Sequence, residues 1–318
     1  MKKILILSLS VLSTLLFSAC TDQANQPESQ AENIIGKHTI RFTEPPKRIP
    51  APHSVDAPLL GNGFTGVALS GTPESQVFYV ARNDFWRLKS ALDESFPLVL
   101  GKIELDIPQL KDASYLVEQQ LYDAVSTTRF TKGDISVSYK AFVPATEDML
   151  IVDLNMEGNG SVEGTAGISF LGKEEQIDKP PLERIFPDVR EHEMKPNGIE
   201  YLSRAFVDSV DIPTKGAMAL RVSGSTDGKF TLEPGKTVRL VCAFSSNFKS
   251  DDCVATVIKK VEDFTPARQA EIEKSHKEWW RNYWEKSYVS IPDSVIEKQY
   301  YLSLYGMGAC SRDMDFPP

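Results

Sequence analysis

The tetrapeptide Asn83-Asp84-Phe85-Trp86 combines the residue types that best suit ligand binding in this sequence. An aromatic ring beside an amide and a carboxylate matches a sugar, which presents apolar C–H faces and hydroxyl groups together. A structural interpretation stays open, in which the Trp fills the interior of a sandwich and the polar pair shapes a loop. We predict Asn83, Asp84 and Trp86 as substrate-binding residues beside that alternative.

A glycine-rich segment precedes it, Gly61-Asn62-Gly63-Phe64-Thr65-Gly66, with the spacing of a dinucleotide-binding loop. The surroundings do not fit such a loop, because Pro52 and Pro58 interrupt the segment before it and the residues that follow cannot form a helix. The glycines therefore predict a tight turn into a strand. Asn62, within this turn, is a further substrate-binding candidate.

The other residues that often carry chemistry predict no site. Glu191-His192-Glu193 lies in a charged run that we expect to be solvated rather than metal-binding. His276 falls on an aromatic helical stripe, where a packed histidine is the simpler interpretation. No serine stands in a G-x-S-x-G elbow, and the sequence pairs no two carboxylates as acid and base. We predict no catalytic residue, no metal and no cofactor.

The composition is that of a soluble globular protein, with 318 residues, 41% of them apolar and 25% charged. The net charge of −9 argues against nucleic acid as a partner, since phosphates require a basic footprint. It permits a neutral carbohydrate. Cys242, Cys253 and Cys310 allow one disulfide, and Cys242, in an apolar strand, is predicted to be a buried thiol.

The N-terminus has the three parts of an export signal. Lys2-Lys3 is basic, residues 4–17 are mostly apolar, and Phe17-Ser18-Ala19-Cys20 resembles the bacterial lipoprotein box. We predict a signal peptide over 1–19, a lipid on Cys20 as the sole membrane attachment, and a flexible tether over 20–34. This places the protein in the cell envelope, at the outer membrane or the cell surface. A plain secretory peptide with a chance cysteine is the alternative.

Residues 35–247 carry strand signals. Ile135, Val137 and Tyr139 alternate with polar neighbours, the period of a half-buried strand, and Gly- or Pro-containing turns separate such runs. Residues 230–244 predict a hairpin, and the charged segment 173–197 predicts a long surface loop. The expected fold class is mainly β, a large antiparallel β-sandwich.

Helical signals follow, in a linker over 248–292 and a last segment over 293–318. One helix is predicted over 251–264, and Thr265-Pro266 predicts the start of another that runs to about Trp284. Its broad aromatic stripe is expected to hold Ile272, His276, Trp279 and Tyr283, with the neighbours Trp280 and Trp284. Residues 288–291 look strand-like.

The last helix begins, by prediction, with a capping box from Ser294 to Glu297. It is apolar on more than one face, and that pattern requires packing partners. We expect Tyr300, Tyr301, Leu304 and Tyr305 to find no surface within this chain. Residues 293–318 would then be the start of a truncated helical barrel, and residues 294–318 would be frayed or self-associating in the isolated chain.

Residues 57–63, 66–68 and 83–86 together resemble the opening of family 95 glycoside hydrolases, the α-L-fucosidases and their relatives. The helix with Trp279, Trp280 and Trp284 and the helix from Tyr300 to Arg312 resemble that family's linker and first barrel helix. The pattern departs at Leu60, where a proline is usual, and in the shorter segment ending at Trp86. The resemblance implies a sandwich followed by an (α/α)6 barrel that holds the catalytic residues, so no position here inherits a catalytic role.

We therefore expect the N-terminal sandwich of an exported, lipid-anchored, α-L-fucosidase-like glycoside hydrolase acting on oligo- or polysaccharides, without its catalytic barrel. The reaction implied is inversion, with one acid protonating the leaving oxygen while a second group activates water. This chain alone is expected to be inactive. The alternative is a non-catalytic glycan-binding surface lipoprotein, and a polysaccharide lyase is a third interpretation.

Replacing Cys20 by Ser tests the anchor. We expect the Cys20→Ser protein to lose the mass of the lipid and to leave the membrane fraction, because this thiol is the attachment point that the leader offers. Intact-mass measurement and cell fractionation follow the two changes. Cys310→Ser is the matched control and should behave as the wild type. An unchanged mass and location for Cys20→Ser would rule the anchor out.

Overall fold

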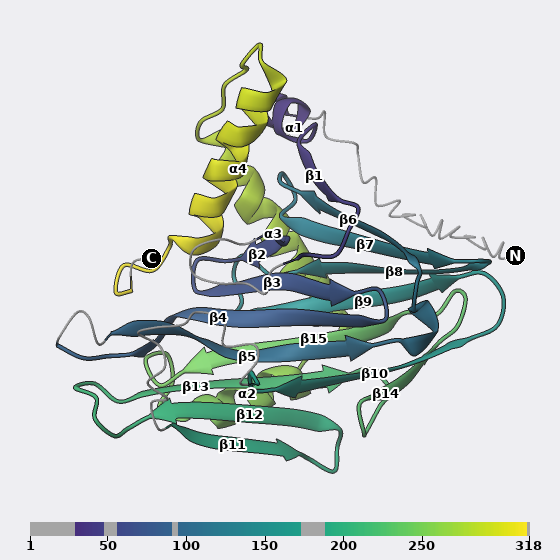
Figure 1. The fold of residues 1–318 in the computed structure, drawn as a ribbon. Helices are drawn as coiled ribbons and strands as arrows, with labels where there is room; N and C mark the ends of the chain where they lie inside the picture. Colours follow the sequence, from purple (N-terminus) through teal and green to yellow (C-terminus); the bar gives the residue numbers. More distant parts are fainter. Residues whose placement is uncertain (1–28, 48–55, 91–94, 173–187, 317–318) are drawn as a thin grey trace, which may run out of the picture.

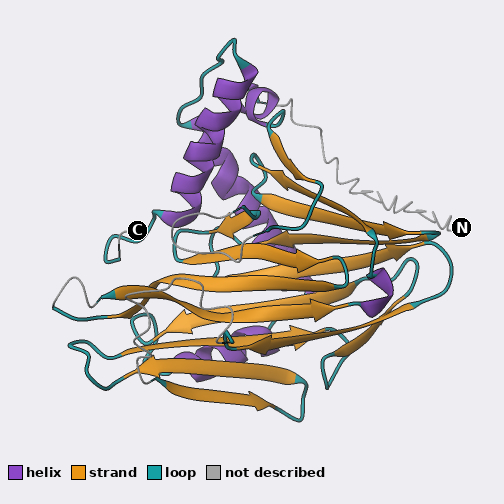
Figure 2. Cartoon of the chain, in the orientation of Figure 1, coloured by secondary structure: helices purple, strands orange, loops and turns teal. Residues whose placement is uncertain are grey.

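The structure is a computed structural model that describes residues 29–47, 56–90, 95–172 and 188–316, so Cys20 and the leader lie outside it. It shows two antiparallel sheets packed face to face, with helices at the outer side of one sheet and at one end (Figure 1, Figure 2). The predicted fold class, mainly β with an antiparallel sandwich, is confirmed.

Each sheet is described by its spatial strand order. The nine-stranded sheet runs β1 (Thr39–Phe42), β6 (Ser114–Gln120), β7 (Val125–Lys132), β8 (Ile135–Phe142), β9 (Met149–Glu157), β15 (Val238–Ser246), β13 (Thr214–Val222), β12 (Ile199–Phe206), β11 (Val189–Met194). The six-stranded sheet runs β14 (Lys229–Leu232), β10 (Val162–Ser169), β5 (Phe96–Asp106), β4 (Ser75–Arg87), β3 (Thr65–Thr72), β2 (Leu59–Gly61). A short 3-10 helix, η2 (Pro108–Leu110), follows β5.

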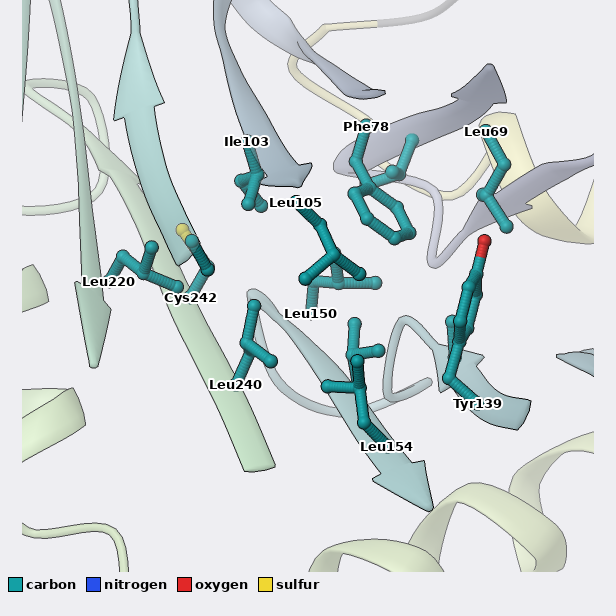
Figure 3. Close-up of a cluster of buried hydrophobic side chains, with 14 of the residues drawn as sticks. Leu69, Phe78, Ile103, Leu105, Tyr139, Leu150, Leu154, Leu220, Leu240 and Cys242 are labelled. Carbon is teal, nitrogen blue, oxygen red and sulfur yellow. The ribbon is translucent and has the colours of Figure 1, made fainter. Parts of the chain in front are cut away.

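The main core lies between the sheets. β8 buries Val137 and Tyr139 while Ser138 and Lys140 stay half-exposed, as the alternation predicts. Cys242 is a buried free thiol, as predicted, and burial raises its pKa. Figure 3 shows the two inner faces meeting through Leu69, Phe78, Ile103 and Leu105 on one side and Tyr139, Leu150, Leu154, Leu220, Leu240 and Cys242 on the other.

The predicted hairpin over 230–244 is wrong. β14 pairs with β10 in the six-stranded sheet, whereas β15 pairs with β13 and β9 in the other. The turn at Gly235, whose φ is 76°, therefore carries the chain from one sheet to the other. A polar turn between two apolar runs fits a hairpin and a corner between sheets equally, so the partners available in each sheet decide the pairing.

The predicted loop over 173–197 is wrong in its last part. Residues 189–194 form β11, the edge strand beside β12, and every residue of it is exposed. Its charged side chains are typical of an edge that avoids further pairing. His192 is therefore on a strand, with its Nε2 2.7 Å from Glu200 Oε1. Residues 173–187 lie outside the described ranges.

Both predicted helices are present, and they pack on the nine-stranded sheet. In α2 (Cys253–Glu262) the N-cap Asp252 accepts a hydrogen bond from Ala255 N, and in α3 (Pro266–Glu285) Thr265 accepts one from Arg268 N. α2 packs Cys253, Val257 and Val261 onto the outer side of the sheet. These caps satisfy amide groups that the first turn of a helix leaves without partners.

The buried stripe of α3 is Gln269, Ile272, His276, Trp280 and Trp284, whereas Trp279 and Tyr283 are only half-buried. The predicted broad stripe included all four of these aromatic residues, and their three-to-four spacing alone did not show which of them are fully buried. His276 is packed, as predicted. Its Nε2 donates to Asp123 O at 2.8 Å, its Nδ1 accepts from Ala145 N at 3.1 Å, and burial lowers its pKa to about 4.

The expectation that Tyr301 and Tyr305 lack a surface is wrong. In α4 (Ser294–Cys310) they are 0% and 2% exposed, because they pack on Trp284 and Trp280 with ring centroids 6.1 and 5.3 Å apart. We call Trp280, Trp284, Tyr301 and Tyr305 the aromatic cluster.

The expected tether over 20–34 also needs correction, because Gln30–Ile35 forms helix α1, which buries Ala31, Ile34 and Ile35 against this cluster.

Two local predictions near α4 are also corrected. Its N-cap is Asp293, which accepts from Val295 N and Ile296 N, while Glu297 accepts from Ile291 N instead of closing a capping box on Ser294. Residues 288–291 are not a strand. The Tyr301 hydroxyl accepts a hydrogen bond from Val289 N and donates one to Val289 O. These are the two backbone groups that a neighbouring strand would otherwise pair with.

Among the helices of the described ranges, none combines the length and apolarity needed to cross a membrane.

His276 predicts a pH-dependent stability. Its pKa is about 4 in the folded chain against the ordinary value of 6.5, so the unfolded chain binds the proton first as the pH falls. The contribution of this residue is complete above about pH 6.5 and is lost progressively toward pH 4, by about 3 kcal/mol at most. Urea unfolding between pH 4 and 7 measures it.

The matched variants separate this effect from the titration of carboxylates. His276→Gln should unfold more easily at pH 7 and show a flatter profile, whereas His192→Gln, on the exposed edge strand, should keep the wild-type slope. Equal slopes for His276→Gln and the wild type would show that His276 does not cause the dependence.

Candidate functional site

A buried cation organises the end of the sandwich where the predicted binding residues lie. The side chain of Arg82 is 0% exposed. Its Nε and Nη2 donate to the two carboxylate oxygens of Asp84, each at 2.9 Å, and its Nη1 donates to Asp148 Oδ2 and Thr65 Oγ1, each at 3.1 Å. Burial by itself would lower the pKa of Arg82, but Asp148 and Asp84 more than offset it and raise the pKa. The Arg82 guanidinium therefore holds three segments together: β3 through Thr65, β4 through Asp84, and the loop before β9 through Asp148.

Asn62 and Ser246 extend these contacts into what we call the Arg82 network: Asn62, Thr65, Arg82, Asp84, Asp148 and Ser246. Ser246 Oγ donates to Asp84 Oδ2 at 2.7 Å, which adds β15 of the opposite sheet. Asn62 Nδ2 reaches Pro144 O, Glu147 O and Asp148 Oδ1, and its Oδ1 accepts from Phe64 N and Thr65 N. The predicted tight turn into a strand is confirmed, because Asn62 closes the turn between β2 and β3.

The four predicted substrate-binding residues divide into two pairs. Asn62 and Asp84 are 1% and 0% exposed, and their polar atoms bond to the protein, so in this conformation they position loops. Asn83 and Trp86 lie half-buried on the outer side of β4. They are near each other, because Trp86 Nε1 donates to Asn83 O at 2.6 Å. The pairing of β4 with β5 shifts register between Ala81 and Trp86, an irregularity often found beside functional sites.

Residues 311–316, which we call the tail segment, cover part of this surface. Asn83 Nδ2 donates to Phe316 O at 3.0 Å, and Lys249 Nζ donates to Asp313 Oδ2 at 2.9 Å. Asn83 Oδ1 is buried and has no hydrogen-bond partner within the described part of the chain. The amide of Asn83 is thus the group of this surface that retains an unused acceptor.

Arg312 attaches the tail segment to two separate elements. Its guanidinium carbon lies 3.8 Å from the ring centroid of Trp279 in α3 and 5.9 Å from that of Phe64 in the turn before β3. Burial lowers the pKa of Arg312, and Asp148 opposes that shift. Contacts of the cation with two aromatic faces stabilise this arrangement.

Sequence reasoning missed Arg82, Asp148 and Arg312. A signal for Arg82 was present, because it follows Phe78 and Val80 at alternate positions and so belongs to the inner side of β4. A charge there requires a counterion, and Asp84 is two residues away. Asp148 and Arg312 carry no comparable local signal, because only the tertiary structure brings them to this end.

The donor groups of the site suit hydrogen bonding and aromatic contact with a neutral ligand. Across the described ranges, no three His, Cys, Asp or Glu side chains converge as metal ligands would. Cys20, the predicted lipid site, lies outside those ranges.

No protein-family model and no curated protein matches this sequence. Among solved structures, the fold is similar to a putative kojibiose phosphorylase from the human microbiome, with a TM-score of 0.58 and 12% identity over 86% of this chain and 42% of that chain. A bacterial glucoamylase complexed with acarbose aligns with a TM-score of 0.40 and 13% identity, over 86% of this chain and 44% of the other. The first of these likenesses shows a shared fold, and this chain spans less than half of either matched chain.

Removing the buried cation should be costly. Arg82→Met leaves the Asp84 carboxylate without its charge partner, and breaking a buried pair in this way costs about 3–5 kcal/mol. Urea unfolding at pH 7 measures the loss. Arg129→Met, which breaks the exposed pair with Glu157, is the matched control and should cost less than about 1 kcal/mol. Equal small losses in both variants would mean that the Arg82 network does not support this end of the sandwich.

Proposed function

We propose that this chain is the sandwich of a glycoside-hydrolase-like protein and that the surface of Asn83 and Trp86 borders a bound glycan. The observation that carries the proposal is the fold likeness to the putative kojibiose phosphorylase, which extends over 86% of this chain. More than half of that protein has no counterpart here, so the proposal assigns glycan contact, and not bond cleavage, to these residues.

The outer side of α4 supports the presence of a helical neighbour. Ile296 and Met307, each 57% exposed, are three turns apart on the same side of α4, opposite the buried Tyr305. Val295 nearby is 75% exposed. Large apolar side chains on one face of a helix favour contact with another apolar surface. The family 95-like segments imply that further barrel helices would provide it and would hold the catalytic acid.

The finer parts of the proposal are export, anchoring through a lipid on Cys20 at the outer membrane or cell surface, and α-L-fucosidase-like specificity. The lipoprotein-like Phe17-Ser18-Ala19-Cys20 supports the first two. The segments 57–63 and 83–86 support the third, and the implied reaction is inverting hydrolysis on the helical domain.

A second candidate function is a non-catalytic glycan-binding surface lipoprotein. The burial of Tyr301 and Tyr305 within this chain favours it, because the inner face of α4 is already covered by α3 and α1. Glycan binding is common to both candidates, and turnover by a form that includes a helical domain separates them.

Binding of oligosaccharides to the purified chain tests the shared proposal. We expect binding on a panel that includes fucosylated and α-glucosyl oligosaccharides, and about two- to tenfold weaker binding by Trp86→Ala, since a lost aromatic contact is worth about 0.5–1.5 kcal/mol. Calorimetry measures the affinities. Tyr288→Ala, in the α3–α4 connection, is the control and should bind as the wild type. We expect no turnover of aryl α-L-fucosides by this chain.

Two results would contradict the proposal. If no glycan on the panel binds the wild type, the sandwich has no glycan-binding role. If the purified chain turns over an aryl glycoside above a heat-treated control, catalytic carboxylates lie within the sandwich and the assignment of catalysis to a further domain is wrong.

A further inference from the structure

A cavity lies on the outer side of the nine-stranded sheet, away from β4. It is bounded by the ends of β6, β7 and β8 and by α3, and its volume is about 140 Å³. Its polar lining comes from Gln120, Asp123, Thr127, Lys140, Glu273 and Lys277, above Val125, Phe142 and His276. We call it the α3 pocket. We propose that it binds one neutral sugar ring, as an auxiliary subsite for the glycan; this inference rests on the proposed function.

The size of the α3 pocket favours a small ligand. Pockets for drug-sized molecules have volumes of roughly 300–1,000 Å³, well above the 140 Å³ found here. A single ring fits that scale better than a stretch of several sugars. The rest of an oligosaccharide would lie outside the pocket.

Lys140 supplies N–H donors that no residue of the described ranges accepts. It stands opposite Asp153 in the register of β8 and β9. Asp153 already accepts from Arg239 Nε at 2.5 Å and from Gln269 Nε2 at 3.1 Å. The Lys140 ammonium forms no ion pair with any described residue and lies 5.3 Å from the ring centroid of Phe142. It is therefore free to donate to a ligand in the α3 pocket.

The acceptors stand on the other sides of the pocket. Glu273 Oε1 accepts from Gln269 Nε2 at 2.8 Å, which leaves its second oxygen for a ligand. The Asp123 carboxylate has no ion-pair partner within the described ranges. Two carboxylates would repel an anion and two ammonium groups would repel a cation, whereas a sugar hydroxyl donates to one and accepts from the other. This mixture of charges favours a neutral polyhydroxyl compound.

The walls of the α3 pocket are held in place before any ligand arrives. His276 bonds Asp123 O on one side and Ala145 N on the other, and its ring centroid lies 5.0 Å from that of Phe142. α3 is thus fixed to both loops that flank the pocket. A preformed site loses less free energy to ordering when it binds.

Binding of D-glucose, L-fucose and a fucosylated oligosaccharide to the full chain tests the inference. NMR titration should move the amide signals of Thr127 and Lys140 in the wild type. Lys140→Met and Asp123→Asn should each weaken this response at least tenfold, while the circular dichroism spectrum stays unchanged. Lys236→Met, in an exposed turn, is the matched control and should respond as the wild type.

The outcomes separate this inference from the proposed function. If glycan binds with shifts near Trp86 and none near Thr127, or if Lys140→Met and Asp123→Asn bind as the wild type, the α3 pocket is not a subsite and the proposed function stands. Stronger shifts at Thr127 with glucuronate or glucosamine than with glucose would overturn the neutral ligand class. If no sugar moves any signal, the proposed function and the subsite both fail.

Discussion

A guanidinium removed from water is stable only when its charge and its N–H groups are matched, and the end of this sandwich is built around that constraint. Arg82 points into the interior from β4, so Asp84, Asp148 and Thr65 must converge on it from separate segments. Asn62 and Ser246 then fix the loop before β9 and the end of β15 to the same centre. Because neighbouring residues of a strand face opposite sides, Asn83 is turned outward by the arrangement that turns Arg82 inward.

The helices depend on a second buried contact of a different kind. His276 is neutral, and each ring nitrogen bonds a backbone group of a different loop, which aligns α3 with the sheet. That alignment presents Trp280 and Trp284 to α4, and Tyr301 and Tyr305 complete the aromatic cluster. Arg312 links two elements beside these groups, because its guanidinium lies over Trp279 in α3 and near Phe64 in the turn before β3. The tail segment is therefore held by both parts of the molecule.

These contacts leave two surfaces with groups suited to carbohydrate, on different sheets. One carries Asn83 and Trp86 on β4, and the other is the α3 pocket with Lys140 and Asp123. The fold is similar to that of a putative kojibiose phosphorylase over 86% of this chain, at 12% identity. Two spaced subsites would orient a long glycan more firmly than either alone, since the second contact forms at high effective concentration.

Local patterns in the sequence determined much of the fold. Alternation in β8, the caps Asp252 and Thr265, and the turn at Asn62 could all be predicted, because each depends on residues close together along the chain. The same logic placed Asn83 beside Trp86, and it could have placed Arg82 inside. Only the tertiary structure decided that β14 and β15 belong to different sheets, that Asp148 and Arg312 reach the site, and that Tyr301 and Tyr305 have a surface to pack on. These outcomes depend on contacts between residues far apart in the chain, and the local propensities of a segment do not indicate which distant residues it will contact.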